Sequence, residues 1–355
     1  KHLYQTPDPH SLVGGLSLLG GNYQSQVNLQ GRRIEMEIEK VLHILQDGRF
    51  HSGEVIGKEL GISRAAVWKV LQKAKEECGI AIHRVPGKGY RLANPLSLLD
   101  SSRLLPSLAE LSWALSLRSQ IDSTNAEALR LMAGRSRQPL VVLAEAQSNG
   151  RGRRGRHWVS PYGENLYFTL GCSVAGGFAQ LAGLSLVVGI ATLRALESEG
   201  LANGGLKWPN DIYSHGKKIA GILVEIAGDP ADLCQVAIGI GVNVNMTESA
   251  SSIDQEWTSL RLQLGRFIDR SALAIQLAQQ LQRYLQRFLD RGFHAFKDEW
   301  EQAHLWQGEE CLLNTPLTSI QGVVLGVDGQ GGIRLRVDGR EQVFCGGELS
   351  LRRIE

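Results

Sequence analysis

The spacing of apolar residues changes three times along this 355-residue chain, and these changes constrain the fold more than any other feature. Residues 1–35 are rich in Gly, Ser, Gln and Asn without a sustained period, so we expect a disordered extension. From Met36 to residue 97 the apolar residues recur at helical spacing and end in two short β runs. Strand-like and helix-like runs alternate over residues 98–306, and residues 307–355 hold only short alternating runs. The pattern predicts an α+β multidomain protein whose folded domains are 36–97, 98–306 and 307–355.

The middle region has the pattern of a mixed α/β domain. The expected helices are Ala179–Glu199, which is mostly apolar, and the amphipathic Ser271–Leu289 and Phe293–Leu305. The expected strands are Leu140–Ala144, Asn165–Leu170, Gly205–Lys207, Ile219–Ile226 and Leu233–Val244. In the tail, Asp-Gly turns at residues 328–329 and 338–339 separate the short runs, which predicts a small antiparallel barrel.

Composition excludes several classes of protein. Lys and Arg number 38 against 36 Asp and Glu, a net charge of +2, so any nucleic-acid binding must be local. The five cysteines are odd in number and form no Cys-x-x-Cys pair, which argues against a disulfide scaffold or a zinc finger. No run of about 18 apolar residues is evident, so we expect no membrane helix, and we expect a reduced, cytoplasmic compartment.

Residues 53–74 have the spacing of a helix-turn-helix. Gly57 is small where two helices must touch, Gly61 supplies the turn, and Ser63 is placed to cap the second helix. After Gly79, two β runs joined by the turn at residues 86–89 add a hairpin wing. Because helix and wing together are what DNA-binding modules present, we predict DNA contacts from Ser63, Arg64, Ala65, Trp68, Lys69 and Lys88. The alternative is that the two helices only pack on each other.

The run from Gln147 to Trp158 contains four arginines within residues 151–156, separated by glycines. Glycines let backbone N–H groups approach a ligand closely, and arginines supply fixed positive charge for phosphate oxygens. We therefore predict an anion-binding loop that is mobile until a ligand orders it. The alternative is a short RNA-binding segment, which is less favoured because the run lies between two predicted core strands.

Two further stretches place polar side chains where strands or helices end. Pro209 breaks a strand beside Asn210 and Asp211, and Lys218 begins an apolar strand. A carboxylate and an ammonium there can flank a reacting carboxyl and phosphate, although a surface hairpin with solvated charges fits the spacing equally well. Residues 122–125, Asp-Ser-Thr-Asn, precede an amphipathic helix, where N-capping and polar ligand recognition are compatible readings.

These motifs, in this order and spacing, resemble those of the biotin–protein ligases. The matching stretches are Ser123–Asn125, Gly150–Arg156, Trp208–Asp211, Lys218–Gly221 and the glycine-rich Gly239–Asn245. The helix-turn-helix and its wing are similar to those of the bifunctional bacterial form, the biotin operon repressor. The resemblance runs from about Met36 to the C-terminus. It implies a catalytic domain like that of class II aminoacyl-tRNA synthetases and a C-terminal SH3-like β-barrel.

The resemblance also implies a two-step, ATP-dependent reaction. The biotin carboxylate attacks the α-phosphate of ATP, which gives biotinyl-5′-AMP and pyrophosphate, and Mg²⁺ accompanies the ATP. A lysine of the biotin carboxyl carrier protein, an acetyl-CoA carboxylase subunit, then attacks the adenylate. The adenylate is also the expected corepressor: with it bound, the protein is expected to form a homodimer and repress biotin synthesis genes at operator DNA.

Residue roles carry over from the resemblance motif by motif. The residues expected to bind biotin are Ser123, Thr124, Asn125, Gln147, Arg151, Gly152, Arg153 and Lys218. Those expected to bind ATP or the adenylate are Arg153, Arg156, Trp158, Asn210 and Asn243. Lys218, Arg153 and Asp211 are the expected catalytic residues, and Asn210 and Asp211 are candidates for positioning Mg²⁺ or deprotonating the acceptor lysine. The loop Met246–Trp257 is expected to help enclose the adenylate.

Two other functions remain as alternatives at this point. A lipoate–protein ligase shares the general chemistry, but the arginine–glycine loop and the Trp-Pro-Asn-Asp run favour biotin. A transcription factor could use the α/β domain only as a metabolite sensor. The presence of Lys218 and the arginines argues against that reading.

Overall fold

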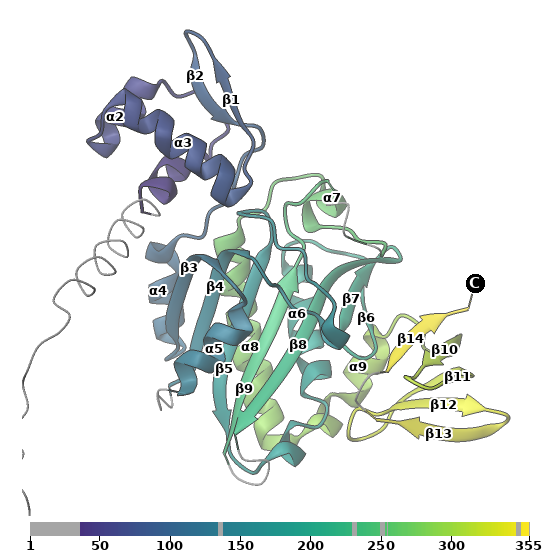
Figure 1. Ribbon diagram of the computed structural model, residues 1–355. Helices are drawn as coiled ribbons and strands as arrows, with labels where there is room; N and C mark the ends of the chain where they lie inside the picture. Colours follow the sequence, from purple (N-terminus) through teal and green to yellow (C-terminus); the bar gives the residue numbers. More distant parts are fainter. Residues whose placement is uncertain are drawn as a thin grey trace, which may run out of the picture.

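The computed structural model describes residues 36–133, 138–228, 233–248, 253, 255–345 and 349–354. The predicted disorder of residues 1–35 lies outside these residues. Figure 1 shows three parts in succession: a helical module with a β hairpin, a central sheet flanked by helices, and a small sheet beside it. The α+β architecture predicted from the sequence is confirmed.

The N-terminal module is a helix-turn-helix followed by a two-stranded wing. Its elements are a helix at residues 36–45, α2 (Gly53–Leu60), α3 (Arg64–Cys78), β1 (Ile82–Val85) and β2 (Gly89–Leu92). Ser63 caps α3 as predicted, because its Oγ accepts a hydrogen bond from Ala66 N at 3.2 Å. Gly57 permits the close helix contact, since a Cβ there would lie 2.6 Å from the carbonyl oxygen of Ile62.

A seven-stranded sheet forms the central domain, in the order β3-β4-β5-β9-β8-β7-β6. The strands are β3 (Ala114–Ile121), β4 (Leu140–Gln147), β5 (Leu166–Val174), β6 (Gly204–Lys207), β7 (Asp211–Ser214), β8 (Lys217–Gly228) and β9 (Cys234–Val242). β3 and β4 are parallel, and the other neighbouring pairs are antiparallel. Each strand predicted from the sequence is present, whereas β3 and β7 were not predicted.

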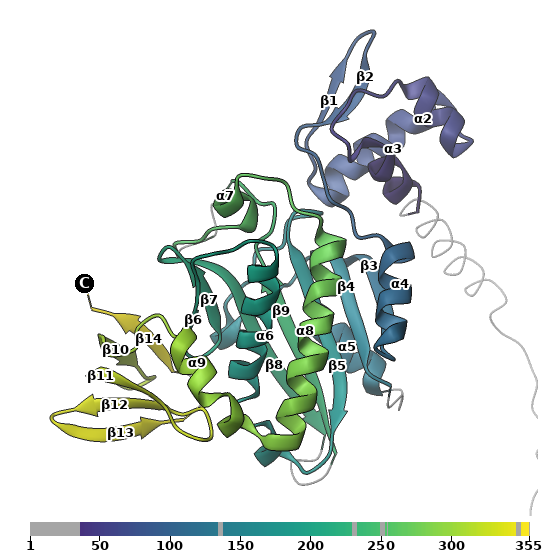
Figure 2. The same ribbon diagram turned by 180° about the vertical axis from the view of Figure 1, so that it is seen from behind.

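Helices cover both faces of this sheet, as Figures 1 and 2 show from opposite sides. α5 (Thr124–Ala133) packs over β4, β5 and β9, while α6 (Leu184–Ser198) and α8 (Arg270–Arg291) pack together on the other face. The remaining α-helices among the described residues are α4 (Ser101–Glu110), α7 (Leu260–Leu264) and α9 (Lys297–Ala303). The helix predicted over 293–305 is a 3₁₀ turn, Phe293–Phe296, continued by α9.

The apolar helix α6 begins later than the sequence predicted. Residues Phe178–Leu181 form a 3₁₀ turn, and the helix starts only after Gly183, whose φ is 78°. By length and hydropathy the stretch Phe178–Ser198 could cross a membrane, although no such run was expected from the sequence. Because 67% of its most apolar window is buried inside the protein, it serves here as a core helix.

The C-terminal domain is a five-stranded antiparallel sheet in the order β13-β12-β11-β10-β14. Its strands are β10 (Glu310–Asn314), β11 (Ser319–Val327), β12 (Ile333–Val337), β13 (Arg340–Phe344) and β14 (Ser350–Arg353). The antiparallel arrangement that the sequence predicted is present, and β13 and β14 are the edges of the described sheet. The indole N–H of Trp208 donates to Gly331 O at 3.1 Å and attaches this domain to the central one.

A buried ion pair fixes the segment that joins the helical module to the central domain. Arg270 begins α8, is fully buried, and pairs with Glu145 of β4. Arg270 Nε donates to Ser97 O at 2.6 Å, and Leu99 N donates to Glu145 Oε1 at 2.7 Å. The backbone of residues 97–99 is therefore held by both members of a charge pair inside the protein.

Candidate active site

Two adjoining cavities lie where β4, β8 and β9 meet the start of α5 and the loop before β5. One is narrow, about 60 Å³, and the other is open and about 650 Å³. The predicted residues that line one or both are Ser123, Thr124, Asn125, Gln147, Arg151, Gly152, Arg153, Arg156, Trp158, Asn210 and Lys218. Asp211 and Asn243 line neither of these two cavities. Three motifs that are distant in sequence thus converge on one place.

The narrow cavity has a connected polar wall. Gln147 Oε1 accepts hydrogen bonds from the backbone N of Thr124 at 2.9 Å and from its hydroxyl at 3.1 Å. The Thr169 hydroxyl lies 2.8 Å from that of Thr124 and 2.7 Å from Asn125 Oδ1. Ser123 also caps α5, since its Oγ accepts from Ala126 N at 3.5 Å. The capping reading of this motif is confirmed, and ligand recognition stays a prediction compatible with it.

Thr169, which the sequence reasoning missed, is not itself a lining residue but supports this wall through Thr124 and Asn125. It is fully buried in β5 among apolar residues. The sequence could have pointed to Thr169, because its hydroxyl stands alone in a strand predicted to be buried. Buried hydroxyls almost always have a hydrogen-bond partner.

Glycines leave room for two side chains above β8 and β9. A Cβ on Gly239 would lie 2.3 Å from Asn125 Oδ1, and one on Gly241 would lie 2.5 Å from Trp158 Cε2. Contacts this short are not tolerated, so the glycine-rich strand of the sequence is explained by what packs on it. Trp158 also lies beneath Lys218, whose Nζ is 5.4 Å from the centre of the indole ring.

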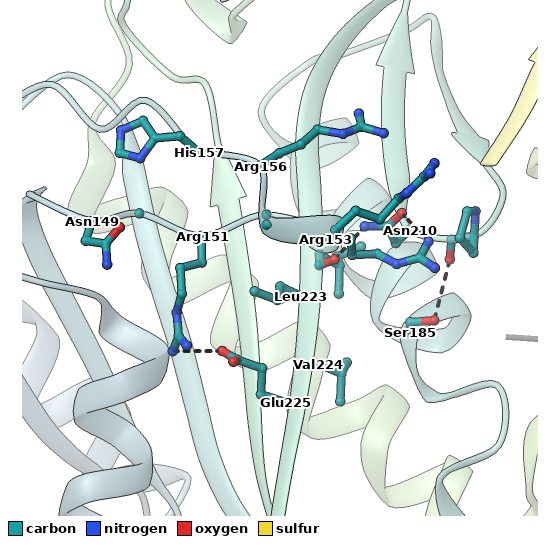
Figure 3. A pocket seen from close by; sticks show the side chains of 16 residues that line it. Asn149, Arg151, Arg153, Arg156, His157, Ser185, Asn210, Leu223, Val224 and Glu225 are labelled. Atoms are coloured by element: carbon teal, nitrogen blue, oxygen red, sulfur yellow. Dashed lines mark hydrogen bonds and ion pairs between the residues drawn. The ribbon is translucent and has the colours of Figure 1, made fainter. Parts of the chain in front are cut away.

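The arginine run forms a small hairpin that borders both cavities (Figure 3). Gly152 N donates to Arg156 O at 2.7 Å, and Trp158 N donates to Gly150 O at 2.8 Å. Arg154, at the tip, has a left-handed backbone with φ of 61°. We call residues 150–158 the arginine hairpin.

Side chains tie the arginine hairpin to the sheet at two points. Arg151 Nη2 lies 3.1 Å from Glu225 Oε2, and Arg153 Nη1 donates to Asn210 Oδ1 at 3.2 Å. In Figure 3, Arg151 extends toward Glu225 and Arg153 toward Asn210. Burial lowers the pKa of Arg153, while Asp211 opposes that shift.

Lys218 and Asp211 form a largely buried ion pair at the start of β7 and β8. Lys218 Nζ lies 2.8 Å from Asp211 Oδ1, and the two side chains are 11% and 16% exposed. Neighbouring Lys207 donates to the Tyr213 hydroxyl at 3.0 Å, and burial lowers the pKa of this lysine. The spacing had left a solvated surface hairpin equally open; the structure places this pair in the interior.

Asn243 supports the loop that follows β9 and lines neither of the two cavities. Its Nδ2 donates to Thr258 O at 3.0 Å, and its backbone N donates to Ile219 O at 2.9 Å. The same loop returns to Lys218, whose backbone N donates to Glu256 O at 3.0 Å. Part of Met246–Trp257, residues 249–252 and 254, lies outside the described residues.

The predicted DNA contacts lie on the surface of the N-terminal module. Every one of them is exposed, namely Ser63, Arg64, Ala65, Trp68, Lys69 and Lys88. Trp68, which belongs to α3, is 45% exposed. The first turns of α3 and the wing tip are thus free to meet a groove.

Comparison with known proteins gives two family models and several full-length relatives. The HTH domain model matches residues 37–91, and the model of the biotin/lipoate A/B protein ligase family matches residues 117–243. The chain is 38% identical over 317 residues to the bifunctional ligase/repressor BirA of Escherichia coli K12, covering 89% of this chain and 97% of that protein. It is 36% identical to the biotin–[acetyl-CoA-carboxylase] ligase of Paracoccus denitrificans, covering 64% and 96%.

A solved structure adds a three-dimensional match. The biotin protein ligase from Aquifex aeolicus in complex with biotin and ATP is 31% identical, with a TM-score of 0.60. The match covers 68% of this chain and 99% of that one.

Proposed function

The chain belongs to the biotin–protein ligase family in its bifunctional ligase/repressor form, and we propose here how its residues divide between the two activities. It is a biotin–[acetyl-CoA-carboxylase] ligase and a DNA-binding repressor. The alternatives of a lipoate ligase and of a sensor domain without ligase activity are set aside, because the full-length relative carries both functions.

The proposed domain division is 36–97 for DNA binding, 98–306 for catalysis and 307–355 for the C-terminal domain. Buried residues of the first domain form a cluster that also includes Leu98 and Tyr162 of the second. One large cluster spans the second and third domains, and a small one lies within the second. This packing supports treating the second and third domains as one rigid support for the site.

In the first step we assign the biotin head group to the narrow cavity and the phosphates of ATP to the open one. Ser123, Thr124 and Gln147 offer hydrogen bonds to a polar head group. The arginine hairpin and Lys218 would receive the carboxylate and the α-phosphate, two anions whose repulsion must be offset before they react. The observation that carries this assignment is that residues 151–153 of the arginine hairpin line both cavities, while Lys218, paired with Asp211, lines the narrow one.

ATP would bring Mg²⁺ with it. Among the described residues, no three His, Cys, Asp or Glu side chains come together as a metal site. Asp211 could supply one carboxylate oxygen, which fits Mg²⁺ because this ion is usually held by one or two carboxylates together with phosphates and water. When bound, Mg²⁺ would offset phosphate charge.

In the second step the carrier lysine replaces AMP. Its neutral amine attacks the acyl carbon of biotinyl-5′-AMP, the bond from that carbon to the phosphate oxygen breaks, and AMP leaves as the amide forms. Asp211 is the proposed acceptor of the amine proton. Lys218 would offset the charge that returns to the phosphate.

For the repressor activity we assign base and phosphate contacts to the exposed residues of α3 and the wing. A module of this size makes few phosphate contacts, and two copies in one dimer would double them and fix a half-site spacing. We therefore propose an adenylate-bound homodimer on a two-fold operator, in the cytoplasm, with the carrier protein as the second partner. Contacts of the adenylate with the arginine hairpin and the Met246–Trp257 loop would favour the dimer-competent state.

Fluorescence anisotropy with a labelled palindromic operator tests this coupling. Biotin with ATP should tighten binding strongly, and neither ligand alone should do so at the same concentration. Arg64→Ala and Lys69→Ala should abolish operator binding and leave ligation intact, because both residues are remote from the cavities. Equal affinity with and without the two ligands would contradict the proposed coupling.

A further inference from the structure

Glu225 of β8 is a carboxylate inside a site built to receive anions. Its Oε2 accepts a hydrogen bond from Asn125 Nδ2 at 2.8 Å and lies 3.1 Å from Arg151 Nη2. Asn125 belongs to the first turn of α5, and Arg151 belongs to the arginine hairpin. One carboxylate therefore joins three separate elements, and Figure 3 shows Arg151 reaching down to it from the hairpin.

Both N–H donors of the Asn125 side chain are used within the protein. Its Nδ2 donates to Leu223 O at 3.1 Å as well as to Glu225, and its Oδ1 accepts from the Thr169 hydroxyl at 2.7 Å. A carboxamide has two N–H donors, so both are already in use. The side chain is only 4% exposed. Asn125 is thus part of the frame of the narrow cavity, and Glu225 is one of the groups that hold it there.

Arg151 pairs with Glu225, although 38% of its side chain is exposed. The arginine hairpin has two side-chain ties to the sheet, Arg151 to Glu225 and Arg153 to Asn210. Both cavities share the hairpin residues Arg151, Gly152 and Arg153. If the Arg151–Glu225 pair breaks and the arginine hairpin moves, the wall that separates the two cavities therefore changes.

We propose that Glu225 is a positioning residue of the ligase site: it acts through Asn125 and Arg151 and fixes the arginine hairpin over the narrow polar cavity. The inference rests on the proposed placement of biotin in that cavity. In this arrangement the anionic ligand meets the hairpin backbone, Arg153 and Lys218, while the guanidinium of Arg151 stays paired with Glu225. Glu225 itself lines the open cavity, but Asn125 and Arg151, through which it acts, both line the narrow one. Loss of Glu225 should therefore change biotin affinity more than turnover.

The test measures pyrophosphate release from ATP at varied biotin concentration. Glu225→Leu removes the hydrogen bond from Asn125 and the ion pair with Arg151. It should raise KM for biotin about tenfold, with kcat at saturating biotin within about twofold of wild type. Glu225→Gln keeps an oxygen that can accept from Asn125 and loses the charge that faces Arg151. Its KM should rise only about threefold, because the ion pair is partly exposed, at 38% and 26%.

A double-mutant cycle separates a positioning role from a merely structural one. Arg151→Met should raise KM about as much as Glu225→Gln, and combining the two changes should add little, since both break the same tie. Glu127→Gln is the matched control: it alters a carboxylate on the same helix as Asn125 that pairs with Arg118 and Arg130 and lines neither cavity. The control should behave like wild type.

The possible outcomes are distinct. The proposal would be overturned if the increases in KM for biotin caused by Glu225→Gln and Arg151→Met multiplied in the double variant. A fall in kcat at unchanged KM would overturn it as well. Normal KM in a folded Glu225→Leu protein would overturn it too, and if that variant does not fold, the cycle alone decides. A wild-type protein that releases no pyrophosphate with biotin would instead contradict the proposed function itself.

Discussion

Replacing Glu145 by Gln should destabilise the protein far more than its conservative chemistry suggests. Glu145 is 8% exposed at its side chain, and its partner Arg270 is 0% exposed. Gln has nearly the same shape and keeps an oxygen that can accept from Leu99 N. What the change removes is the negative charge that compensates a guanidinium enclosed by protein.

The magnitude follows from that burial. Removing one partner of a buried ion pair costs about 3–5 kcal/mol, because the remaining charge is left uncompensated. Arg270 would still donate to Ser97 O and Asn165 O, at 2.6 Å and 2.7 Å, so we expect the lower end, about 3 kcal/mol. For a domain of about 200 residues this is a fall in Tm of about 6–12 °C.

Urea unfolding followed by tryptophan fluorescence gives the free energy of unfolding. Arg103→Gln is the matched control, since Arg103 pairs at 2.6 Å with Asp269 near the start of α8, but both side chains are almost half exposed. That control should cost less than about 1 kcal/mol. A second comparison adds Arg270→Met to Glu145→Gln, which should recover part of the loss because the unpaired charge is gone. If Glu145→Gln costs no more than Arg103→Gln, the Glu145–Arg270 pair does not hold residues 97–99 in place.

Further predictions concern the site and its surroundings. Lys218→Ala should reduce adenylate formation by about 10²–10³, or about 3–4 kcal/mol, while the fold survives, and normal pyrophosphate release from the folded variant would remove this lysine from the site. Gly241→Ala should displace Trp158, because the new Cβ would lie 2.5 Å from its ring, and an unchanged tryptophan emission spectrum would argue against the packing described. Burial lowers the pKa of His304 to about 4 from 6.5, so its neutral form stabilises the fold above pH 6.5, and this stabilisation, up to about 3 kcal/mol, is lost as pH falls toward 4. The difference in unfolding free energy between wild type and His304→Phe should therefore change between pH 7 and pH 4, and a constant difference would contradict the assignment. Hydrogen exchange across residues 150–158 should slow when biotin binds, and equal exchange in saturated protein would show that ligand does not order the arginine hairpin.

Local chemistry made several features predictable from sequence. Ser63 caps its helix and Gly57 allows the helix contact, because both effects depend on residues within a few positions along the chain. The start of α6 was placed too early, since Phe178 and its neighbours are as apolar as the helix itself. What ends the turn and begins the helix is Gly183, where a Cβ would lie 2.4 Å from the Phe293 ring, a contact 110 positions away in sequence that no local pattern reveals.

Long-range pairing explains what the sequence did not reveal at the site. Glu225 lay within the predicted strand Ile219–Ile226, yet it received no role, because its partners Asn125 and Arg151 come from other elements. The pairing of Arg270 with Glu145 was equally hidden, since the residues are 125 positions apart. Residue types and spacing therefore indicated the chemistry, whereas the groups that position it became visible only in the fold.

Ligation of a carrier domain is the most direct test of the account. The purified protein is incubated with ATP, Mg²⁺, a biotin carboxyl carrier domain and either biotin or lipoate, and the carrier mass is then measured. We predict that the mass increases by one biotinyl group when biotin is present, that the carrier is unchanged with lipoate, and that omission of ATP prevents the increase. An unmodified carrier with biotin and ATP, or a lipoyl group added in its place, would contradict the assignment of this site.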